Sequence, residues 1–228
     1  MKIPRIIHQT WKTKETPTHF RGFAESWRNL HPSWDFVFWD DDDNEKFIAE
    51  HFPWFIRFYR RYEFDIQRVD AVRYFILLKY GGVYIDLDFE CLKPIDALLA
   101  DEQCVLCLEP REHCRYHNLP YIISNAFMAT TPRHPFFNNI IKELVFYRSN
   151  SSSINDFVLQ TTGPFVLNRV YERFSDQAAL KILPSSLLFP LSYREAERRL
   201  YLTESEVLAT RLADAYGIHY HWGTWWAK

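Results

Sequence analysis

The sequence predicts an α/β fold in which a mostly parallel sheet is flanked by helices. Short apolar stretches, typical of buried strands, alternate with longer amphipathic stretches, typical of helices, along most of the chain. The chain has 228 residues, which is a comfortable length for one such domain and enough to bury a core without disulfide staples. Because there is no internal repeat, low-complexity tract or long linker, we expect a single domain over residues 1–228.

The N-terminal region holds two expected strands. Residues 3–11 (IPRIIHQTW) are expected to form a strand followed by a loop, and residues 34–40 (WDFVFWD) a second strand. Four consecutive aspartates, at positions 40–43, then precede a helix over residues 44–52 (NEKFIAEHF). Acidic residues stabilise the start of a helix through its dipole, so we interpret this run as a helix cap. A place near a bound nucleotide is the alternative for Asp40, because ligands of open α/β sheets bind beyond the strand ends.

The next segment, residues 51–64 (HFPWFIRFYRRYEF), combines aromatic side chains with Arg57, Arg60 and Arg61. This pattern predicts an amphipathic helix, and we prefer an ordinary helix that packs on the core. Contact with a membrane interface is the alternative.

The most informative part of the chain is residues 65–90 (DIQRVDAVRYFILLKYGGVYIDLDFE). A helix is expected to end at Gly81-Gly82, and a strand to follow over residues 83–90. Side chains alternate between the two faces of a strand, so the polar ones share one face, namely Tyr84, Asp86, Asp88 and Glu90. A row of carboxylates repels itself unless a cation lies beside it, and oxygen ligands suit hard divalent cations. We therefore interpret Asp86 and Asp88 as a metal site, with solvated loop carboxylates as the alternative.

Two charged residues, Asp70 and Arg73, lie on the helix that precedes this strand. They are three residues apart and therefore point the same way, on a face that is otherwise apolar. One interpretation is an intrahelical ion pair at the edge of the core. The other is a pair that binds the hydroxyls of a polyol beside the metal.

The second half of the chain continues the alternation of strands and helices. Strands are expected at residues 104–110 and 126–130, and an amphipathic helix at residues 134–148. A polar loop over residues 149–155 is followed by a helix at 165–174. A short strand is expected within residues 181–190, and mixed helix and loop over residues 194–216.

Four cysteines occur, at positions 91, 104, 107 and 114. Cys104 and Cys107 have the CxxC spacing of zinc and redox motifs. A zinc site needs two further ligands, and although Cys114 and a nearby histidine offer them, the spacing matches no zinc module that we can justify. We therefore expect buried thiols in a reducing compartment.

Charge and hydropathy exclude several classes of protein. Lys and Arg total 27 and Asp and Glu total 29, so the chain lacks the basic footprint of nonspecific nucleic-acid binding. Lys2, Pro4 and Arg5 interrupt any apolar run at the N-terminus, so no signal peptide is expected. The longest apolar stretches, such as residues 74–78, are too short to cross a bilayer. The expected location is cytoplasmic, with or without peripheral contact at a membrane.

The segment 69–94 (VDAVRYFILLKYGGVYIDLDFECLKP) resembles the DXD signature of glycosyltransferase family 32. That family includes yeast-type mannosyltransferases and inositolphosphoceramide mannosyltransferases, and the large clostridial glucosylating toxins share the signature. Further blocks match in order over nearly the whole chain. They are Ile3–Lys12, Ser26–Asp42, Ser124–Phe137, Thr161–Pro164 and His219–Trp226.

The resemblance implies a Rossmann-like glycosyltransferase A (GT-A) fold. It also implies transfer of a hexose, with retention of configuration, from a UDP- or GDP-sugar to a glycan, glycolipid or glycoprotein acceptor. The implied ion is Mn²⁺, with Mg²⁺ as the alternative, and building a polysaccharide or another surface glycan is the expected role. Front-face attack, which needs no enzyme nucleophile, is our preferred mechanism.

The resemblance also assigns roles to particular residues. The implied metal ligands are Asp86, Asp88, His221 and Thr224, and the implied catalytic residues are Asp86, Asp88 and Trp226. His219 and His221 are two apart and are expected to share a strand face. Donor-binding roles fall to Trp11, which would stack on the base, and to Asp70, Arg73 and Asn125, which would hold the sugar. Tyr84, on the carboxylate face, is expected to face the site as well.

Two other classes of function remain as alternatives. A metal-dependent hydrolase of nucleotide sugars or phosphodiesters would use the same ion but release free sugar. A non-catalytic domain that binds sugars or nucleotides would be expected to lack a site carboxylate, yet both aspartates of the motif are present.

Overall fold

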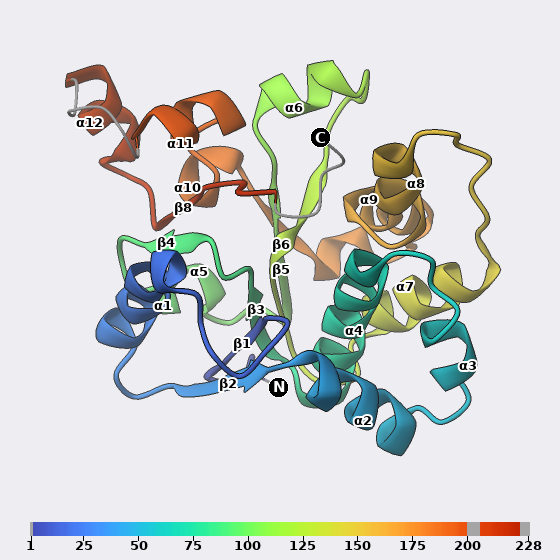
Figure 1. The fold of residues 1–228 in the computed structure, drawn as a ribbon. Coiled ribbons are helices and arrows are strands. Elements are labelled where there is room, and N and C mark those ends of the chain that lie inside the picture. Colours follow the sequence, from blue (N-terminus) through green and yellow to red (C-terminus); the bar gives the residue numbers. More distant parts are fainter. Residues whose placement is uncertain (1, 200–205, 224–228) are drawn as a thin grey trace.

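The computed structural model describes residues 2–199 and 206–223, and a six-stranded sheet forms its centre (Figure 1). The strands lie in the order β2-β1-β3-β6-β5-β7. Every neighbouring pair is parallel except the two that involve β6, which runs antiparallel to both β3 and β5. The predicted sheet, mostly parallel and flanked by helices, is therefore confirmed. The strands are β1 (Ile6–Thr10), β2 (Asp35–Trp39), β3 (Gly82–Ile85), β5 (Cys104–Leu108), β6 (Ile123–Thr130) and β7 (Lys181–Leu183).

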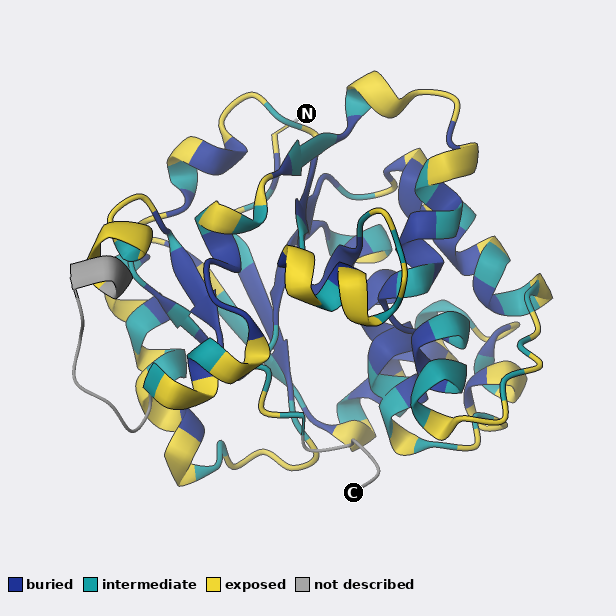
Figure 2. Cartoon of the chain, turned by 90° about the horizontal axis from the view of Figure 1, so that it is seen from above, coloured by how far each residue is buried: buried dark blue, intermediate teal, exposed yellow. Residues whose placement is uncertain are grey.

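Helices cover both faces of this sheet, and each face has its own core. On β3, Tyr84 packs into a core with α4, α7 and α9, whereas Val83 and Ile85 pack into a core with α1, α5 and α10. Figure 2 shows the buried residues along the strands and on the inward sides of the helices. The longer helices are α1 (Thr18–Leu30), α2 (Asp41–His51), α4 (Asp65–Tyr80), α7 (Pro135–Phe146), α8 (Ile154–Thr161) and α9 (Pro164–Arg173). The shorter ones are α3 (Ile56–Tyr59), α5 (Asp96–Leu99), α6 (Arg111–Tyr116), α10 (Ser185–Leu188), α11 (Tyr193–Arg199) and α12 (Glu206–Leu212), with a 3₁₀ turn at Gln177–Ala179.

The predicted helix stop at Gly81-Gly82 is confirmed, and both glycines are needed there. Their φ angles are +66° and +88°, a region that other residues rarely adopt. A Cβ atom on Gly81 would lie 2.7 Å from Pro132, and one on Gly82 would lie 2.6 Å from the carbonyl oxygen of Ile6. The two glycines thus let helix α4 turn directly into β3, alongside β1.

The expected continuous strand over residues 83–90 is wrong. Strand β3 ends at Ile85, residues 86–88 form a turn, and the chain resumes as β4 (Phe89–Cys91) in a separate sheet with β8 (Gly217–His219). The local pattern is compatible with one long strand. The break arises because β4 pairs with a segment near the C-terminus, which no pattern within residues 83–90 can reveal.

Two predictions about residues 40–64 have different outcomes. Asp40 caps α2 through reciprocal hydrogen bonds with Asp43, so the interpretation of the aspartate run as a cap is confirmed. The single amphipathic helix over residues 51–64 is wrong, because only α3 forms there. Pro53 supplies no N–H donor and disfavours a helical conformation before it, so α2 ends and the chain turns. Contact of this segment with a membrane stays a prediction.

The four cysteines are buried and form no disulfide. Cys104 and Cys107 belong to the cores on opposite faces of the sheet, so the CxxC spacing does not bring both side chains to one ion. Within residues 2–199 and 206–223, no helix is long and apolar enough to cross a membrane.

Candidate active site

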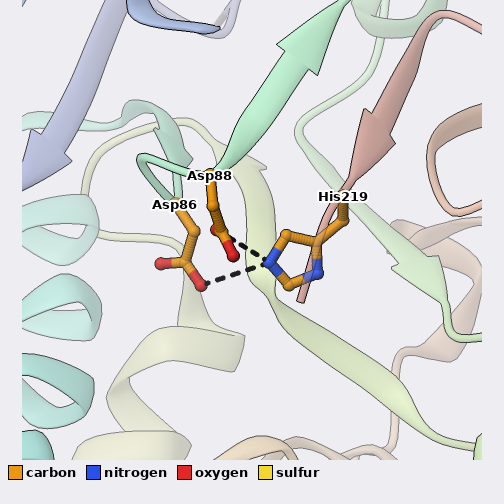
Figure 3. A group of neighbouring side chains, drawn as sticks. All are labelled: Asp86, Asp88 and His219. Atoms are coloured by element: carbon orange, nitrogen blue, oxygen red, sulfur yellow. Dashed lines mark hydrogen bonds and ion pairs between the residues drawn. The ribbon is translucent and has the colours of Figure 1, made fainter. Parts of the chain in front are cut away.

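The two aspartates of the DXD motif and His219 converge at one point (Figure 3). The aspartates lie in the turn between β3 and β4, and His219 is the last residue of β8. The Nε2 atom of His219 lies 3.0 Å from Oδ1 of Asp88 and 3.9 Å from Oδ2 of Asp86. The three ligand atoms all lie within 4.8 Å of one another. Two carboxylates and an imidazole therefore face one small volume.

Pairing of β4 with β8 produces this convergence. The register places Phe89 opposite His219, next to Asp88. Gly217 makes the close approach feasible, because a Cβ atom there would lie 2.7 Å from the ring of Phe89. The segment after β8 also binds the turn, since the N–H of Trp222 donates to Oδ2 of Asp88 at 2.7 Å.

A buried guanidinium connects the DXD turn to helix α4. The side chain of Arg73 lies 3.1 Å from Asp70 and 3.2 Å from Asp86, and it donates to the carbonyl oxygen of Asn125 at 2.9 Å. Asp70 in turn accepts hydrogen bonds from the side chains of Asn125, at 2.9 Å, and Thr162, at 3.3 Å. The predicted sugar-binding residues thus form one network with the first aspartate of the motif.

Tyr84 completes the network from beneath the turn. Its hydroxyl lies 3.0 Å from Oδ1 of Asp86 and 2.9 Å from the hydroxyl of Thr10. The guanidinium of Arg73 lies over its ring, 4.5 Å from the centroid. Because Tyr84 is fully buried, it fixes Asp86 and Arg73 rather than offering an open surface.

The electrostatics of the site follow from burial and from these pairs. Burial raises the pKa of Asp70 to about 6 and raises the pKa of Asp86, although Arg73 opposes both shifts. Burial acts the same way on Asp88, but His219 and the N–H of Trp222 outweigh it and lower the pKa of that carboxyl. Burial would lower the pKa of His219, yet the carboxylate of Asp88 outweighs it and the pKa is raised. The carboxylates of the site thus raise the pKa of His219 and favour its protonated form.

The structure brings His219, rather than the predicted His221, to the aspartates. Strand β8 ends at His219, and His221 has a φ of +49°, so the two histidines do not share a strand face as expected. The ring of His221 lies 4.1 Å from that of His219 and 4.7 Å from that of His113, between centroids, and its Nε2 is buried without a partner. Thr224 and Trp226 lie outside the residues that the structure describes.

An aromatic group borders the site on the side of β1. Trp11, at the end of β1, is half-buried and meets Phe20 edge-on at 5.3 Å. Phe20 also meets Trp222 at 5.6 Å, and Trp222 stacks on His19 at 5.1 Å. Sequence reasoning missed both Trp222 and His219 as site residues. The only available signal was their position in the aromatic C-terminal block.

This donor set fits a divalent cation. Carboxylate oxygens and an imidazole nitrogen together suit Mn²⁺ and similar ions. The Nδ1 atom of His219 is buried without a hydrogen-bond partner, so the present contacts leave the polar atoms of the ring incompletely satisfied. Among the residues that the structure covers, this is the one group of three or more acidic, histidine or cysteine side chains placed to hold a metal.

Sequence comparisons identify a family and relatives of this chain. The family model of the glycosyltransferase sugar-binding region containing a DXD motif matches residues 17–105. Inositol phosphoceramide mannosyltransferase 2 of Schizosaccharomyces pombe is 36% identical over 175 residues, which cover 77% of this chain and 48% of that protein. Mannosyl phosphorylinositol ceramide synthase CSH1 of Saccharomyces cerevisiae is 37% identical over 187 residues, which cover 79% of this chain and 47% of that protein. The chain spans about half the length of the curated relatives it matches.

Solved structures share the fold at low sequence identity. The PaToxG glycosyltransferase superposes with a TM-score of 0.56 at 15% identity, covering 94% of this chain and 85% of the other. The UDP-bound glycosyltransferase domain from the YGT toxin gives a TM-score of 0.56 at 9% identity, covering 93% of this chain and 89% of that domain. These likenesses support the fold alone, and that fold is GT-A. The family model and the mannosyltransferase relatives together show that this chain belongs to the DXD-motif glycosyltransferase family 32.

Proposed function

We propose that residues 1–228 act as one catalytic domain, a metal-dependent retaining hexosyltransferase that uses a nucleotide-diphosphate sugar. The observation that carries this proposal is the grouping of Asp86, Asp88 and His219 within 4.8 Å, beside the buried Arg73. In a glycosyltransferase of this family, such a group of acidic and histidine ligands would bind a divalent cation that also binds the diphosphate of the donor.

Asp86, Asp88 and His219 would hold the ion, which we propose to be Mn²⁺, with Mg²⁺ as the alternative. When bound, it neutralises the negative charge of the departing diphosphate. The roles of Trp11 as a stacking surface for the base, and of Thr224 and Trp226 at the metal and the reacting centre, are further parts of the proposal.

Arg73, Asp70 and Asn125 would orient the donor sugar. The contacts among them hold the guanidinium, carboxylate and amide in fixed positions, and this is the condition for recognising vicinal hydroxyls. The buried Tyr84 keeps the assembly rigid from below.

Retention without an enzyme nucleophile is supported by the positions of the remaining carboxylates. Glu90 accepts a hydrogen bond of 2.6 Å from Tyr220 and lies 3.8 Å from Arg199. Asp70 is paired with Arg73 and accepts hydrogen bonds from two other side chains. Because both carboxylates are engaged, we propose that the acceptor attacks from the face of the leaving group and that its proton passes to the diphosphate.

The names of the relatives guide the proposed substrates. Several are mannosyltransferases, and the acceptor in their names is inositol phosphoceramide. We therefore propose mannose as the transferred sugar and a glycolipid with a sugar or inositol head group as the acceptor. A UDP-linked hexose and a glycan or glycoprotein acceptor are the alternatives.

A thermal-shift screen tests the proposal first. UDP-, GDP-, CDP- and TDP-sugars would each be added with Mn²⁺, Mg²⁺ or EDTA, since a ligand of the native state raises the melting temperature. A shift that requires both a metal and one base supports the site and identifies the nucleotide. The Asp88→Asn variant should lose the shift. Asp96→Asn is the matched control and should keep the shift, because Asp96 is a surface acid paired with Arg5. Absence of any metal-dependent shift in the wild type would overturn the proposal.

A second assay distinguishes a transferase from the alternative, a hydrolase. A transferase consumes donor much faster when a saturating acceptor is present, whereas a hydrolase releases free sugar at a rate that is independent of acceptor. Measuring both products from one labelled donor decides between them.

A further inference from the structure

A polar groove of about 610 Å³ lies between helix α6 on one side and helices α8 and α9 on the other. Figure 1 shows α6 standing across from the α8–α9 pair, above the sheet. The volume is in the range of sites that bind small molecules. The side chains that matter most in the groove are Tyr116, His117, Asp156, Phe165, Arg169 and Glu172.

The wall formed by α8 and α9 supports the candidate active site directly. Thr162, at the junction of these helices, donates a hydrogen bond to Asp70 at 3.3 Å. Its carbonyl oxygen accepts a hydrogen bond of 2.8 Å from the hydroxyl of Tyr74 on α4. This wall is therefore fixed to the residues proposed to hold the donor sugar.

The opposite wall, α6, is linked to the metal group through the ring of His221. The ring of His113 on α6 lies 4.7 Å from that of His221, which in turn lies 4.1 Å from that of His219. The groove is thus enclosed by the two segments that flank the site, one on the side of the sugar and one on the side of the metal. A ligand seated in it would contact residues of both walls.

The charge of the groove disfavours an anionic occupant. Asp156 and Glu172 contribute carboxylates, whereas the guanidinium of Arg169 is already bound to Glu143 and to the carbonyl oxygen of Gln160. Burial lowers the pKa of His117, which leaves that imidazole neutral near pH 7. A nucleotide or free phosphate would meet net negative charge, so the donor is not the natural ligand here.

The lining suits an uncharged polyol. The side chain of Asp156 is 46% exposed, and the neutral imidazole of His117 lies 4.0 Å from its Oδ1, so its oxygens are open to hydroxyl donors. Tyr116 is 83% exposed, and Phe165 lies beside it across His117, with ring contacts of 4.9 and 5.1 Å. A carboxylate next to aromatic rings can bind the hydroxyl rim and the apolar face of one ring-shaped polyol at the same time.

We propose that this groove is the acceptor subsite and binds a sugar or cyclitol ring of the acceptor. The proposal rests on the proposed function, because it names the acceptor chemistry of the same active site. Asp156 would accept hydrogen bonds from ring hydroxyls, and Tyr116 would cover one face of the ring.

Saturation-transfer NMR tests the groove without requiring turnover. The probes are methyl α-D-mannopyranoside and myo-inositol, added to the full chain with the diamagnetic ion Mg²⁺ and the nucleoside diphosphate selected by thermal shift. We expect signal for at least one probe in the wild type, and its affinity should fall about tenfold in Asp156→Ala and in Tyr116→Ala. Phe146→Ala is the matched control, because Phe146 is an exposed aromatic residue, at 79%, that does not line this groove.

The nucleotide-dependent thermal shift distinguishes failure of the acceptor subsite from failure of the proposed function. All three variants should keep that shift, which shows that they fold and bind donor. Equal probe binding in the wild type and both groove variants, or no probe binding to a wild type that binds nucleotide, would overturn the acceptor subsite. A wild type that shows no metal-dependent shift would overturn the proposed function, and the acceptor assignment with it.

Discussion

The carboxylate of Asp88 and the imidazole of His219 lie 3.0 Å apart although 131 positions separate them in the chain. A two-stranded sheet, β4 with β8, brings them together, and the turn that carries Asp88 is also held by the backbone of Trp222. The DXD motif is therefore only one half of the candidate metal group. The other half arrives with the C-terminal strand.

Removing the imidazole should weaken metal binding. Loss of a supporting residue around a metal commonly costs about 10- to 100-fold in affinity, so His219→Ala should cost at least about 100-fold for Mn²⁺ in the presence of nucleotide. Isothermal titration would measure the affinity. His221→Ala is the comparison, and it should have a smaller effect because His221 is not in the group around the aspartates. The reverse order of effects would show that the C-terminal segment binds the metal through His221 instead.

Replacing the buried guanidinium should destabilise the fold. Arg73→Met would leave Asp70 and Asp86 without their buried cation, and breaking such a pair commonly costs about 3–5 kcal/mol. Urea unfolding of the metal-free protein would measure the loss. The double variant Asp70→Asn/Arg73→Met should recover part of it, since one buried charge is then removed. Fully additive losses in the double variant would argue against coupling between the two residues.

Crowding at Gly217 should separate β8 from β4. In Gly217→Ala the new Cβ would lie 2.7 Å from the ring of Phe89 and 2.9 Å from the carbonyl oxygen of Glu90. We expect a lower melting temperature and weaker Mn²⁺ binding, because His219 would move away from Asp88. Gly22→Ala is the control. Gly22 is in helix α1 with open space around it, so alanine there should raise stability by about 0.5–1 kcal/mol. Unchanged metal affinity in Gly217→Ala would show that the strand pairing tolerates the methyl group.

Buried His8 should make the protein sensitive to acid. Its Nε2 lies 3.0 Å from the carbonyl oxygen of Gly81, and its Nδ1 accepts from the indole N–H of Trp39 at 3.3 Å, so both ring nitrogens are engaged in the neutral form. Burial lowers the pKa of His8 to about 4, although the bond to Gly81 opposes this. The unfolded chain therefore binds the proton more readily. The stability from neutral His8 is fully present above about pH 6.5 and is lost as the pH falls toward 4.

Comparing wild type with His8→Gln isolates this contribution. From the lowered pKa, His8 should account for about 2 kcal/mol of the loss in unfolding free energy between pH 7 and pH 5. The glutamine variant should show a correspondingly shallower dependence on pH in urea melts, even if it is less stable at pH 7. Parallel curves for the two proteins would show that His8 does not titrate in this range.

Local sequence determined much of this protein. The stop at Gly81-Gly82, the strands at residues 6–10 and 35–39, and the cap at Asp40 each have a signal in the local sequence, and all were predicted. The DXD segment also identified the family, and the family model that matches residues 17–105 includes this segment.

The composition of the metal group was decided by tertiary structure. The alternation of residues 83–90 is compatible with one strand, and the spacing of His219 and His221 makes either a candidate ligand. The choice follows from the register of β4 against β8, in which Phe89 lies opposite His219, and from the left-handed backbone at His221. Pairing between segments so far apart depends on the packing of the whole chain rather than on local preference. The sequence around His219 and His221 therefore does not predict which of them lies beside the aspartates.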